Sequence, residues 1–366
     1  MICKKLKTRF FRNLIETEIN PCESINIIYG ENGQGKTNIL EAMWLFCGLK
    51  SFRGAKDSEM LFFESEWFQN ELDFFAEDRN QTAKIRFVDG KRETTLNGIK
   101  KTTAARQQNS FSAVAFAPQH MSIVKDGPSV RRRFLDTALS GLSGEYYTQL
   151  SEYSKGLAQR NSLLKDYRLA PALYDHIFMW DEILAKHAAA ITIMRMNYID
   201  KLTEKSAGFY SGISSGKEKM KLTFHSSGID ISQGMTQKEL YEEYKRRFSE
   251  MASEDIRLRT TTVGPHRDDF LIYIDDREAK LFASQGQQRS CALSLKLSEG
   301  ELLSQKLSEH PVILLDDVLS ELDDKRQKYV LNSLSGRQVF ITCCDPGSVT
   351  RLTGGKVFSL KDGKIE

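Results

Sequence analysis

A glycine-rich segment, Gly30–Thr37 (GENGQGKT), constrains the fold of this chain more than any other feature. It matches the pattern G-x-x-x-x-G-K-[ST] and lies between a strand-like run, Ile25–Tyr29, and a helical pattern, Asn38–Cys47. Glycines let backbone N–H groups surround phosphate oxygens, and the following helix directs its positive end at them. We therefore expect a nucleoside triphosphate site, with Lys36 at the β- and γ-phosphates and the Thr37 hydroxyl on Mg²⁺. The expected nucleotide-binding residues are Gly30, Glu31, Asn32, Gly33, Gln34, Gly35, Lys36 and Thr37.

A second feature is the apolar run from Pro311 to Leu315, which ends in Asp316 and Asp317. P-loop ATPases place a metal-associated carboxylate at the end of such a buried strand. Asp316 is therefore expected to hold Mg²⁺ through water, and Asp317 to polarise the attacking water. Taken alone, the run is equally consistent with an ordinary strand that ends in Asp at a turn.

Two polar helix starts accompany these features. Ser284–Ser290 (SQGQQRS) resembles the signature motif of ABC-type ATPases, and Ser320–Asp323 (SELD) resembles their D-loop. Ser284, Gly286 and Gln287 would then meet the nucleotide of a second subunit, because the signature of one subunit covers the P-loop of another in that superfamily. The resemblance implies an ATP-induced head-to-tail dimer. The alternative is a polar helix start without a ligand.

Periodicity predicts an α/β fold in which strands and helices alternate at both ends of the chain. One mixed sheet assembled from both ends, a β-rich lobe and an inserted helical lobe without a long coiled coil are expected. The expected domains are 1–125, 126–255 and 256–366. Turn signals at Asp89–Gly90 and Asn97–Gly98 predict hairpins. Further expectations are an interruption of the helices at Ser206–Gly216, a helix starting at Thr236, and strands at Phe270–Ile274 and Ala279–Ala283.

Composition excludes several classes. The chain has 366 residues, of which 40% are hydrophobic and 28% charged, so the low hydrophobicity of disordered chains is absent. No apolar stretch approaches the roughly 18 residues of a membrane span, and the N-terminus does not resemble a signal peptide. The six cysteines form no CxxC pair, which favours reduced cytosolic thiols. Because the net charge is only +3, any nucleic-acid site must come from a local patch of basic residues.

Together these motifs resemble the RecF family of bacterial recombination mediators over the whole chain. The segments that carry the resemblance are Gly30–Ala42, Ser51–Arg53, Arg131–Asp136, Gly264–Phe270, Ser284–Ser290 and Leu314–Asp323. The resemblance implies a cytoplasmic, ATP- and Mg²⁺-dependent DNA-binding protein with weak DNA-dependent ATPase activity. It implies action at single-stranded gaps and junctions with RecO and RecR, and roles in replication, repair and SOS induction, without a membrane.

Three departures from ABC-type heads stand out. Gln119 is the candidate Q-loop residue, and it is either part of the metal shell or a turn residue. The switch histidine is missing, since Ile341–Asp345 reads ITCCD, and Asp317 replaces a longer Glu. These departures predict slow hydrolysis, with a kcat not well above ~10 s⁻¹.

Other charged residues leave alternatives open. Arg131–Arg133 either contact DNA or a partner, or form ion pairs within the protein. The run Lys245–Arg247 lies among glutamates and is expected to form a solvated face. The sequence leaves open whether Arg257 and Arg259 contact the nucleotide or DNA. His266 is expected to pack near the nucleotide or in the head rather than to bind a metal.

Three other classes of protein carry a P-loop. A transporter subunit would not need the helical insertion, and a coiled-coil chromosome-maintenance head would need hundreds of additional residues. A metabolic P-loop kinase would have no use for the Ser284 and Ser320 motifs. A DNA-binding ATPase switch is the favoured hypothesis.

Overall fold

The computed structural model describes residues 1–48, 50–101, 111–167, 177–231, 234–347 and 354–366. These residues form two compact units. The first unit comprises Met1–Met121, Gly208–Glu218 and Arg289–Glu366, and the second comprises Ser122–Ala207 and Lys219–Gln288. The division into domains 1–125, 126–255 and 256–366 stays a prediction.

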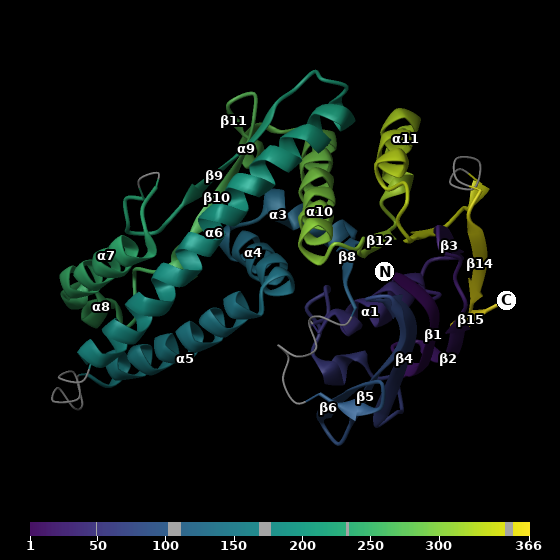
Figure 1. The fold of residues 1–366 in the computed structure, drawn as a ribbon, viewed down its shortest axis with the longest axis horizontal. Coiled ribbons are helices and arrows are strands. Elements are labelled where there is room, and N and C mark those ends of the chain that lie inside the picture. Colours follow the sequence, from purple (N-terminus) through teal and green to yellow (C-terminus); the bar gives the residue numbers. More distant parts are fainter. Residues whose placement is uncertain (49, 102–110, 168–176, 232–233, 348–353) are drawn as a thin grey trace. The chain divides into compact units, whose positions relative to one another are not determined.

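A six-stranded sheet in the first unit carries the glycine-rich segment. Its order is β15-β14-β3-β13-β12-β8. The bounds are β3 Ile25–Tyr29, β8 Ala113–Phe116, β12 Val312–Asp316, β13 Val339–Cys343, β14 Lys356–Lys361 and β15 Lys364–Ile365. All neighbours pair in parallel except β14 and β15. In Figure 1 the yellow β14 lies beside the purple β3, so the two ends of the chain meet in one sheet, as predicted.

An antiparallel sheet forms the β-rich lobe of the same unit, in the order β2-β1-β4-β5-β6-β7. Its strands are β1 Ile2–Phe11, β2 Leu14–Ile19, β4 Trp67–Ala76, β5 Arg79–Val88, β6 Lys91–Leu96 and β7 Ile99–Lys100. Positive φ angles at Asp89, Gly90, Asn97 and Gly98 confirm the two predicted hairpin turns. Its solvent-side cations pair across strands, as Lys5 does with Glu18, so this face is self-neutralised.

The helices of the first unit flank the parallel sheet. They are α1 Lys36–Trp44, α10 Gln285–Leu307 (which begins in the second unit) and α11 Asp324–Ser333, with short 3₁₀ turns η1 Leu45–Cys47, η2 Asp57–Met60, η3 Pro118–Met121 and η6 Leu319–Glu321. One core joins both sheets to α1, since Leu314, Phe340, Phe68 and Leu72 are buried with Leu40. The P-loop helix is therefore fixed between the sheets by apolar burial.

Helices dominate the second unit. They are α3 Ser122–Lys125, α4 Pro128–Leu142, α5 Gly144–Asp166, α6 Ile177–Ser214 (which ends in the first unit), α7 Gln237–Glu250, α8 Ala252–Leu258 and α9 Ala279–Phe282, with the 3₁₀ turn η5 Pro265–Arg267. A three-stranded antiparallel sheet, β11-β10-β9, accompanies them. Its strands are β9 Met220–His225, β10 Asp269–Ile274 and β11 Arg277–Glu278. Thr236 and Glu239 form the predicted capping box at the start of α7. No helix among the described residues is both long and apolar enough to cross a membrane.

Two predictions about local structure are wrong. The Ser206–Gly216 segment does not interrupt the helices, because α6 continues to Ser214. Ser206 and Tyr210 are fully buried there, and packing outweighs the low helix propensity of Ser and Gly. Ala279–Ala283 is not a strand: β11 ends at Glu278 and the chain turns into α9.

Candidate nucleotide-binding site

The glycine-rich loop runs from β3 directly into α1. Gly35 is the N-cap of α1 with a φ of 106°. A Cβ at Gly35 would lie 2.4 Å from Asn13 Oδ1, so only glycine fits there. The first N–H groups of α1 have no partner within their helix and point out of its N-terminus. The loop therefore has the geometry of a phosphate cradle.

Lys36 lies over this loop. Its Nζ donates to the carbonyl oxygens of Gly30 at 2.5 Å and Glu31 at 3.0 Å, and it lies 3.6 Å from Cys344 Sγ. Cys344 Sγ in turn donates to Asn32 Oδ1 at 3.2 Å. Phosphate oxygens would offer the ammonium charged acceptors in place of these neutral ones.

Asparagine side chains support the loop from outside. Asn13 Nδ2 donates to Gly33 O at 2.8 Å, and Asn38 Nδ2 donates to Asn13 Oδ1 at 2.7 Å. Arg53 Nη1 completes the chain with a hydrogen bond to Asn38 Oδ1 at 3.0 Å. Nothing in the sequence distinguishes Asn13 from an ordinary turn residue, because its partners lie 20 and 25 positions away.

Glu41 is a fully buried carboxylate on the far side of α1. Arg12 donates to both of its oxygens, from Nε at 2.9 Å and Nη2 at 3.0 Å, and Ser51 Oγ donates to Oε1. Arg53 Nη1 lies 3.6 Å from Oε2. Glu41 therefore holds two arginines and the Ser51–Arg53 segment against the P-loop helix. Arg12 and Glu41 support the P-loop helix through these contacts, which sequence reasoning did not identify.

The hydroxyl of Thr37 faces the end of β12. Its Oγ1 lies 2.8 Å and 2.9 Å from the two carboxylate oxygens of Asp316. Burial raises the pKa of Asp316, while hydrogen bonds from Thr342 and Thr37 oppose that rise. Both oxygens suit Mg²⁺, which proteins hold through one or two carboxylates and nucleotide phosphates rather than a complete protein cage. No cluster of three or more His, Cys, Asp or Glu ligands occurs among the described residues.

Asp317 is held beside Asp316 in a left-handed conformation, with a φ of 53°. Its N–H donates to Thr342 Oγ1 at 2.9 Å. Ser320 Oγ lies 2.9 Å from both Asp317 Oδ1 and Asp317 O, so this D-loop residue tethers the carboxylate. The structure thus brings the predicted metal-binding and water-activating carboxylates together, and their roles stay predictions.

Gln119 lies in η3, immediately after β8. Its side chain is exposed. A cavity of about 20 Å³ adjoins this segment, and its lining residues are Phe116, Pro118, Met121, Arg289, Leu293, Asp317, Val318 and Leu322. The volume suffices for one water molecule. The Q-loop candidate segment and Asp317 therefore border one small cavity, although Gln119 itself does not line it.

The signature segment begins α10. Ser284 and Gln287 form a reciprocal pair: Ser284 N donates to Gln287 Oε1 at 2.8 Å, and Gln287 N donates to Ser284 Oγ at 3.3 Å. Ser284 is exposed and Gly286 is half-buried. These residues belong to the second unit and the P-loop to the first. A contact of Ser284, Gly286 and Gln287 with nucleotide stays a prediction.

Several basic residues serve the fold. Arg131 forms a bidentate pair with Asp269, both bonds being 2.7 Å, and Arg132 Nη1 donates to Asp268 O at 2.8 Å. For Arg131 this confirms the alternative of an ion pair within the protein, whereas Arg132 binds a backbone carbonyl. Arg257 pairs with Glu254 on the surface of α8, which places it in an ion pair.

His266 has partners at both ring nitrogens. Its Nδ1 lies 2.7 Å from Tyr153 OH and its Nε2 lies 3.0 Å from Thr261 O. Burial lowers the pKa of His266 to about 4, so the ring is neutral near pH 7. The ring therefore packs within the second unit, and its predicted place near the nucleotide or in the head stays a prediction.

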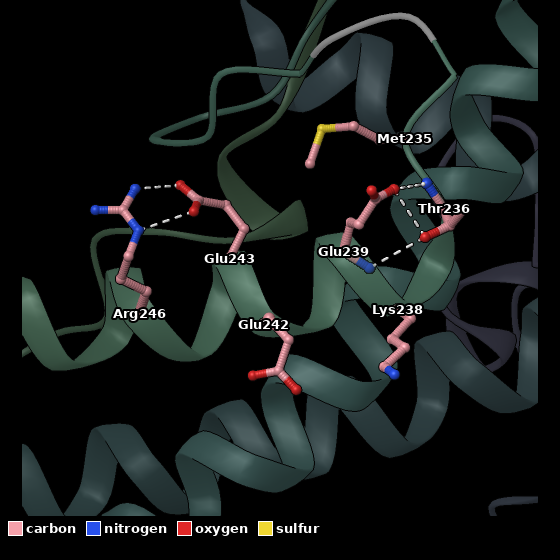
Figure 2. Close-up of a pocket in the computed structure, with 7 residues that line it drawn as sticks. All are labelled: Met235, Thr236, Lys238, Glu239, Glu242, Glu243 and Arg246. Atoms are coloured by element: carbon pink, nitrogen blue, oxygen red, sulfur yellow. Dashed lines mark hydrogen bonds and ion pairs between the residues drawn. The ribbon is translucent and has the colours of Figure 1, made fainter.

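An open hollow of about 560 Å³ lies along the first turns of α7 (Figure 2). Figure 2 shows two pairs of interacting polar groups in its lining: Thr236 with Glu239, and Glu243 with Arg246. Lys245, Arg246 and Arg247 all pair with glutamates, which confirms the predicted solvated face. The hollow presents no catalytic constellation.

These features define an ABC-type P-loop ATPase head of the kind found in chromosome-maintenance proteins. Residues 2–361 match the family described as RecF/RecN/SMC N terminal domain. A solved Smc head from Pyrococcus furiosus, with an extended coiled coil and bound to a ScpA domain, superimposes with a TM-score of 0.57 at 16% identity, covering 100% of this chain and 95% of that one. That likeness shows the fold.

Full-length relatives narrow the class. The DNA replication and repair protein RecF of Caldanaerobacter subterraneus is 38% identical, covering 100% of this chain and 99% of its own, and that of Clostridium acetobutylicum is 37% identical with the same coverage. A solved structure of the recombination mediator protein RecF-ATP in the RecFOR pathway has a TM-score of 0.93 and 36% identity, covering 100% of this chain and 97% of that one. The chain belongs to the RecF family. This confirms the predicted family and fold class.

Proposed function

We propose that this chain is an ATP-dependent DNA-binding switch that acts in replication and recombinational repair. The observation that carries the proposal is the pair formed by Thr37 Oγ1 and Asp316, 2.8 Å apart beside a P-loop. Full-length similarity to proteins named for DNA replication and repair, and to a RecF structure with ATP, supports the same function.

In this proposal each residue of the nucleotide-binding site has a separate role in ATP hydrolysis. ATP with Mg²⁺ supplies the scissile phosphoanhydride bond and the charge that neutralises its phosphates. Loop N–H groups and Lys36 bind the phosphates, and Thr37 and Asp316 fit the metal ion. Asp317 accepts a proton from the attacking water, and Gln119 is proposed as the Q-loop residue of the metal shell. The short reach of Asp317 and the absence of a switch histidine in ITCCD favour slow turnover, with a kcat below ~10 s⁻¹.

Dimer formation completes the site in this proposal. Ser284, Gly286 and Gln287 lie at the N-terminus of the 23-residue helix α10, whose positive end attracts an anion. We place them against the γ-phosphate of a second copy, head to tail. The closed dimer holds single-stranded or gapped DNA and junctions, and hydrolysis releases it.

The proposal extends to setting and partners. Relatives in the RecFOR pathway point to RecO and RecR as partners in recombinase loading, and we include SOS induction among the roles. We place the protein in the cytoplasm. We also propose that it is divided into domains 1–125, 126–255 and 256–366. ATPase activity is expected to be weak and stimulated by DNA.

A labelled gapped duplex tests the switch by fluorescence anisotropy at fixed salt. Wild type with ATP and Mg²⁺ is expected to bind tighter than without nucleotide, and Lys36→Met is expected to lose the difference. Lys306→Met, at the far end of α10, is the matched control. Repeating the titration at several salt concentrations counts phosphate contacts, since each contributes about one unit of log–log slope. Equal binding with and without ATP would refute nucleotide gating.

Light scattering tests the dimer. Ser284→Arg is expected to bind ATP normally and to stay monomeric, whereas wild type becomes dimeric with ATP. If Ser284→Arg dimerises as wild type does, the signature segment does not meet the partner's nucleotide.

A further inference from the structure

Thr342 lies at the carboxyl end of β13, where the missing switch histidine would be sought. It stands in register with Asp316 on β12 and with Ile28 on β3. Its side chain is 1% exposed. The strand order thus places a buried hydroxyl between the P-loop strand and the strand that carries the two carboxylates.

This hydroxyl contacts both carboxylate residues at once. Thr342 Oγ1 donates to Asp316 Oδ1 at 2.7 Å and accepts from Asp317 N at 2.9 Å. A hydroxyl has one donor hydrogen and two acceptor lone pairs, so both bonds form together. Thr37 also reaches Asp316 Oδ1, and the carboxylate is therefore fixed by hydroxyls from the two neighbouring segments.

The hydrogen bond from Asp317 N to Thr342 Oγ1 holds a residue in an uncommon backbone conformation. A left-handed conformation such as that of Asp317 is uncommon for a residue other than glycine, and hydrogen bonds from the surroundings help to hold it. The Thr342 oxygen holds the Asp317 N–H, and Ser320 Oγ holds its carboxylate. Without the Thr342 oxygen, one of these two restraints is gone.

We propose that Thr342 is a positioning residue for ATP hydrolysis, which fixes Asp316 and Asp317 relative to each other through a single hydroxyl. The inference rests on the proposed function, because it gives those carboxylates their roles in metal binding and water activation. Thr342 does not touch the P-loop cradle through any contact that the described residues show, so ATP binding depends little on it. The hydroxyl acts on turnover.

Four variants test this role. Thr342→Val removes the hydroxyl and keeps the branched shape, Thr342→Ala removes it with no risk of overpacking, and Thr342→Ser restores it. Thr8→Val is the matched control, because Thr8 is also a buried strand threonine in the first unit and its hydroxyl has no hydrogen-bond partner among the described residues. Steady-state ATPase assays give kcat and KM, and fluorescent ATP titrations give the equilibrium affinity.

We expect kcat to fall at least tenfold in Thr342→Val and Thr342→Ala, with the ATP affinity within about threefold of wild type; a tenfold loss corresponds to about 1.4 kcal/mol in the barrier. Thr342→Ser and Thr8→Val are expected to keep the wild-type kcat. If Thr342→Val does not fold, the comparison of Ala with Ser carries the test.

The outcomes separate this inference from the proposed function. Wild-type kcat in the Val and Ala variants overturns the positioning role, and so does a loss of ATP affinity as large as the loss of kcat. Failure of Thr342→Ser to restore turnover also overturns it. If wild type binds ATP and hydrolyses none, the proposed function and this inference fall together.

Discussion

Two of the Asp–Asp pairs in this chain, Asp268–Asp269 and Asp316–Asp317, differ in the groups that their carboxylates contact. Asp269 begins β10 in the second unit, and Asp268 directly precedes it. Asp268 accepts from Arg195 Nη1 at 3.1 Å and Asp269 binds Arg131 through two bonds of 2.7 Å. Each negative charge of this pair is neutralised by a guanidinium of the protein itself.

The other pair, Asp316 and Asp317, ends β12 in the first unit. Its carboxylates receive hydroxyl groups, from Thr37 and Thr342 on Asp316 and from Ser320 on Asp317. In the part of the chain that the structure describes, no lysine, arginine or histidine forms an ion pair with either. Asp268 and Asp316 are buried, and Asp269 and Asp317 are half-buried. In the proposed function only the second pair takes its positive charge from a ligand.

The comparison leads us to expect different roles for the two carboxylate pairs. A buried charge must be paired, and the pairing partner decides the role. Where the protein supplies an arginine, the pair stabilises one unit. Where it supplies hydroxyls, the charge is held in place and stays available to a cation. Four substitutions test this difference, from the largest expected effect to the smallest.

Asp268→Asn is expected to cost the most. It leaves Arg195, which is 1% exposed at its side chain, without one of its two carboxylate partners. Removing one member of a buried ion pair typically costs about 3–5 kcal/mol. Urea denaturation followed by circular dichroism measures the loss. The control is Asp276→Asn on an exposed turn, where the change should stay within about 0.5 kcal/mol. A loss below about 1 kcal/mol for Asp268→Asn would break the comparison.

Glu41→Gln sharpens the comparison within the first unit. Glu41 is buried beside the P-loop, yet it is paired with Arg12 and therefore belongs with Asp268 rather than with Asp316. We expect a loss of about 2 kcal/mol, less than at Asp268 because Arg12 reaches solvent and Gln keeps some hydrogen bonds. Glu16→Gln, at an exposed ion-pair partner of Arg9, is the control and should leave the unfolding free energy nearly unchanged. Equal costs for the two variants would refute the assignment of Glu41.

The His266→Gln variant tests whether the buried ring of His266, two positions before Asp268, stays uncharged in the folded protein. Tyr153 and Thr261 bind the ring, Arg132 and Arg267 disfavour its charge, and Asp255 favours it; burial is the main cause of its pKa of about 4. An unfolded histidine titrates near 6.5, so the unfolded state takes up a proton first and stability falls as the pH drops from about 6.5 to 4.

The full shift corresponds to about 3 kcal/mol, and we expect about half of it because the ring is not completely buried. Unfolding free energies at pH 7 and pH 4.5 measure the effect. The Gln variant is expected to lose about 1.5 kcal/mol less than wild type over this range. Equal losses would show that His266 titrates normally in the folded chain.

Local patterns predicted much of the fold and the outline of the site. The P-loop, the β12 carboxylates and the hairpin turns follow from contiguous residues whose local chemistry determines their geometry. The partners of those residues do not: Thr342 reaches Asp316 from 26 positions away. Asp268 and Asp316 both stand in Asp–Asp pairs, so composition cannot tell which receives an arginine. The same limit explains α6, where tertiary burial of Tyr210 outweighed a Gly/Ser-rich signal.

Asp316→Asn is expected to have the smallest effect on stability and completes the comparison. Burial penalises the Asp316 charge, and the hydrogen bonds from Thr342 and Thr37 and the charge of Arg53 offset that penalty only in part. The unfolding free energy without nucleotide should therefore stay within about 1 kcal/mol of wild type or rise. ATP with Mg²⁺ should raise the melting temperature of wild type, because a ligand that binds only the folded state stabilises it. The Asn variant should show a smaller rise with Mg²⁺ present and the same response as wild type in EDTA. A large loss of stability without nucleotide, comparable to that of Asp268→Asn, would mean that both pairs are structural and that the cation site lies elsewhere.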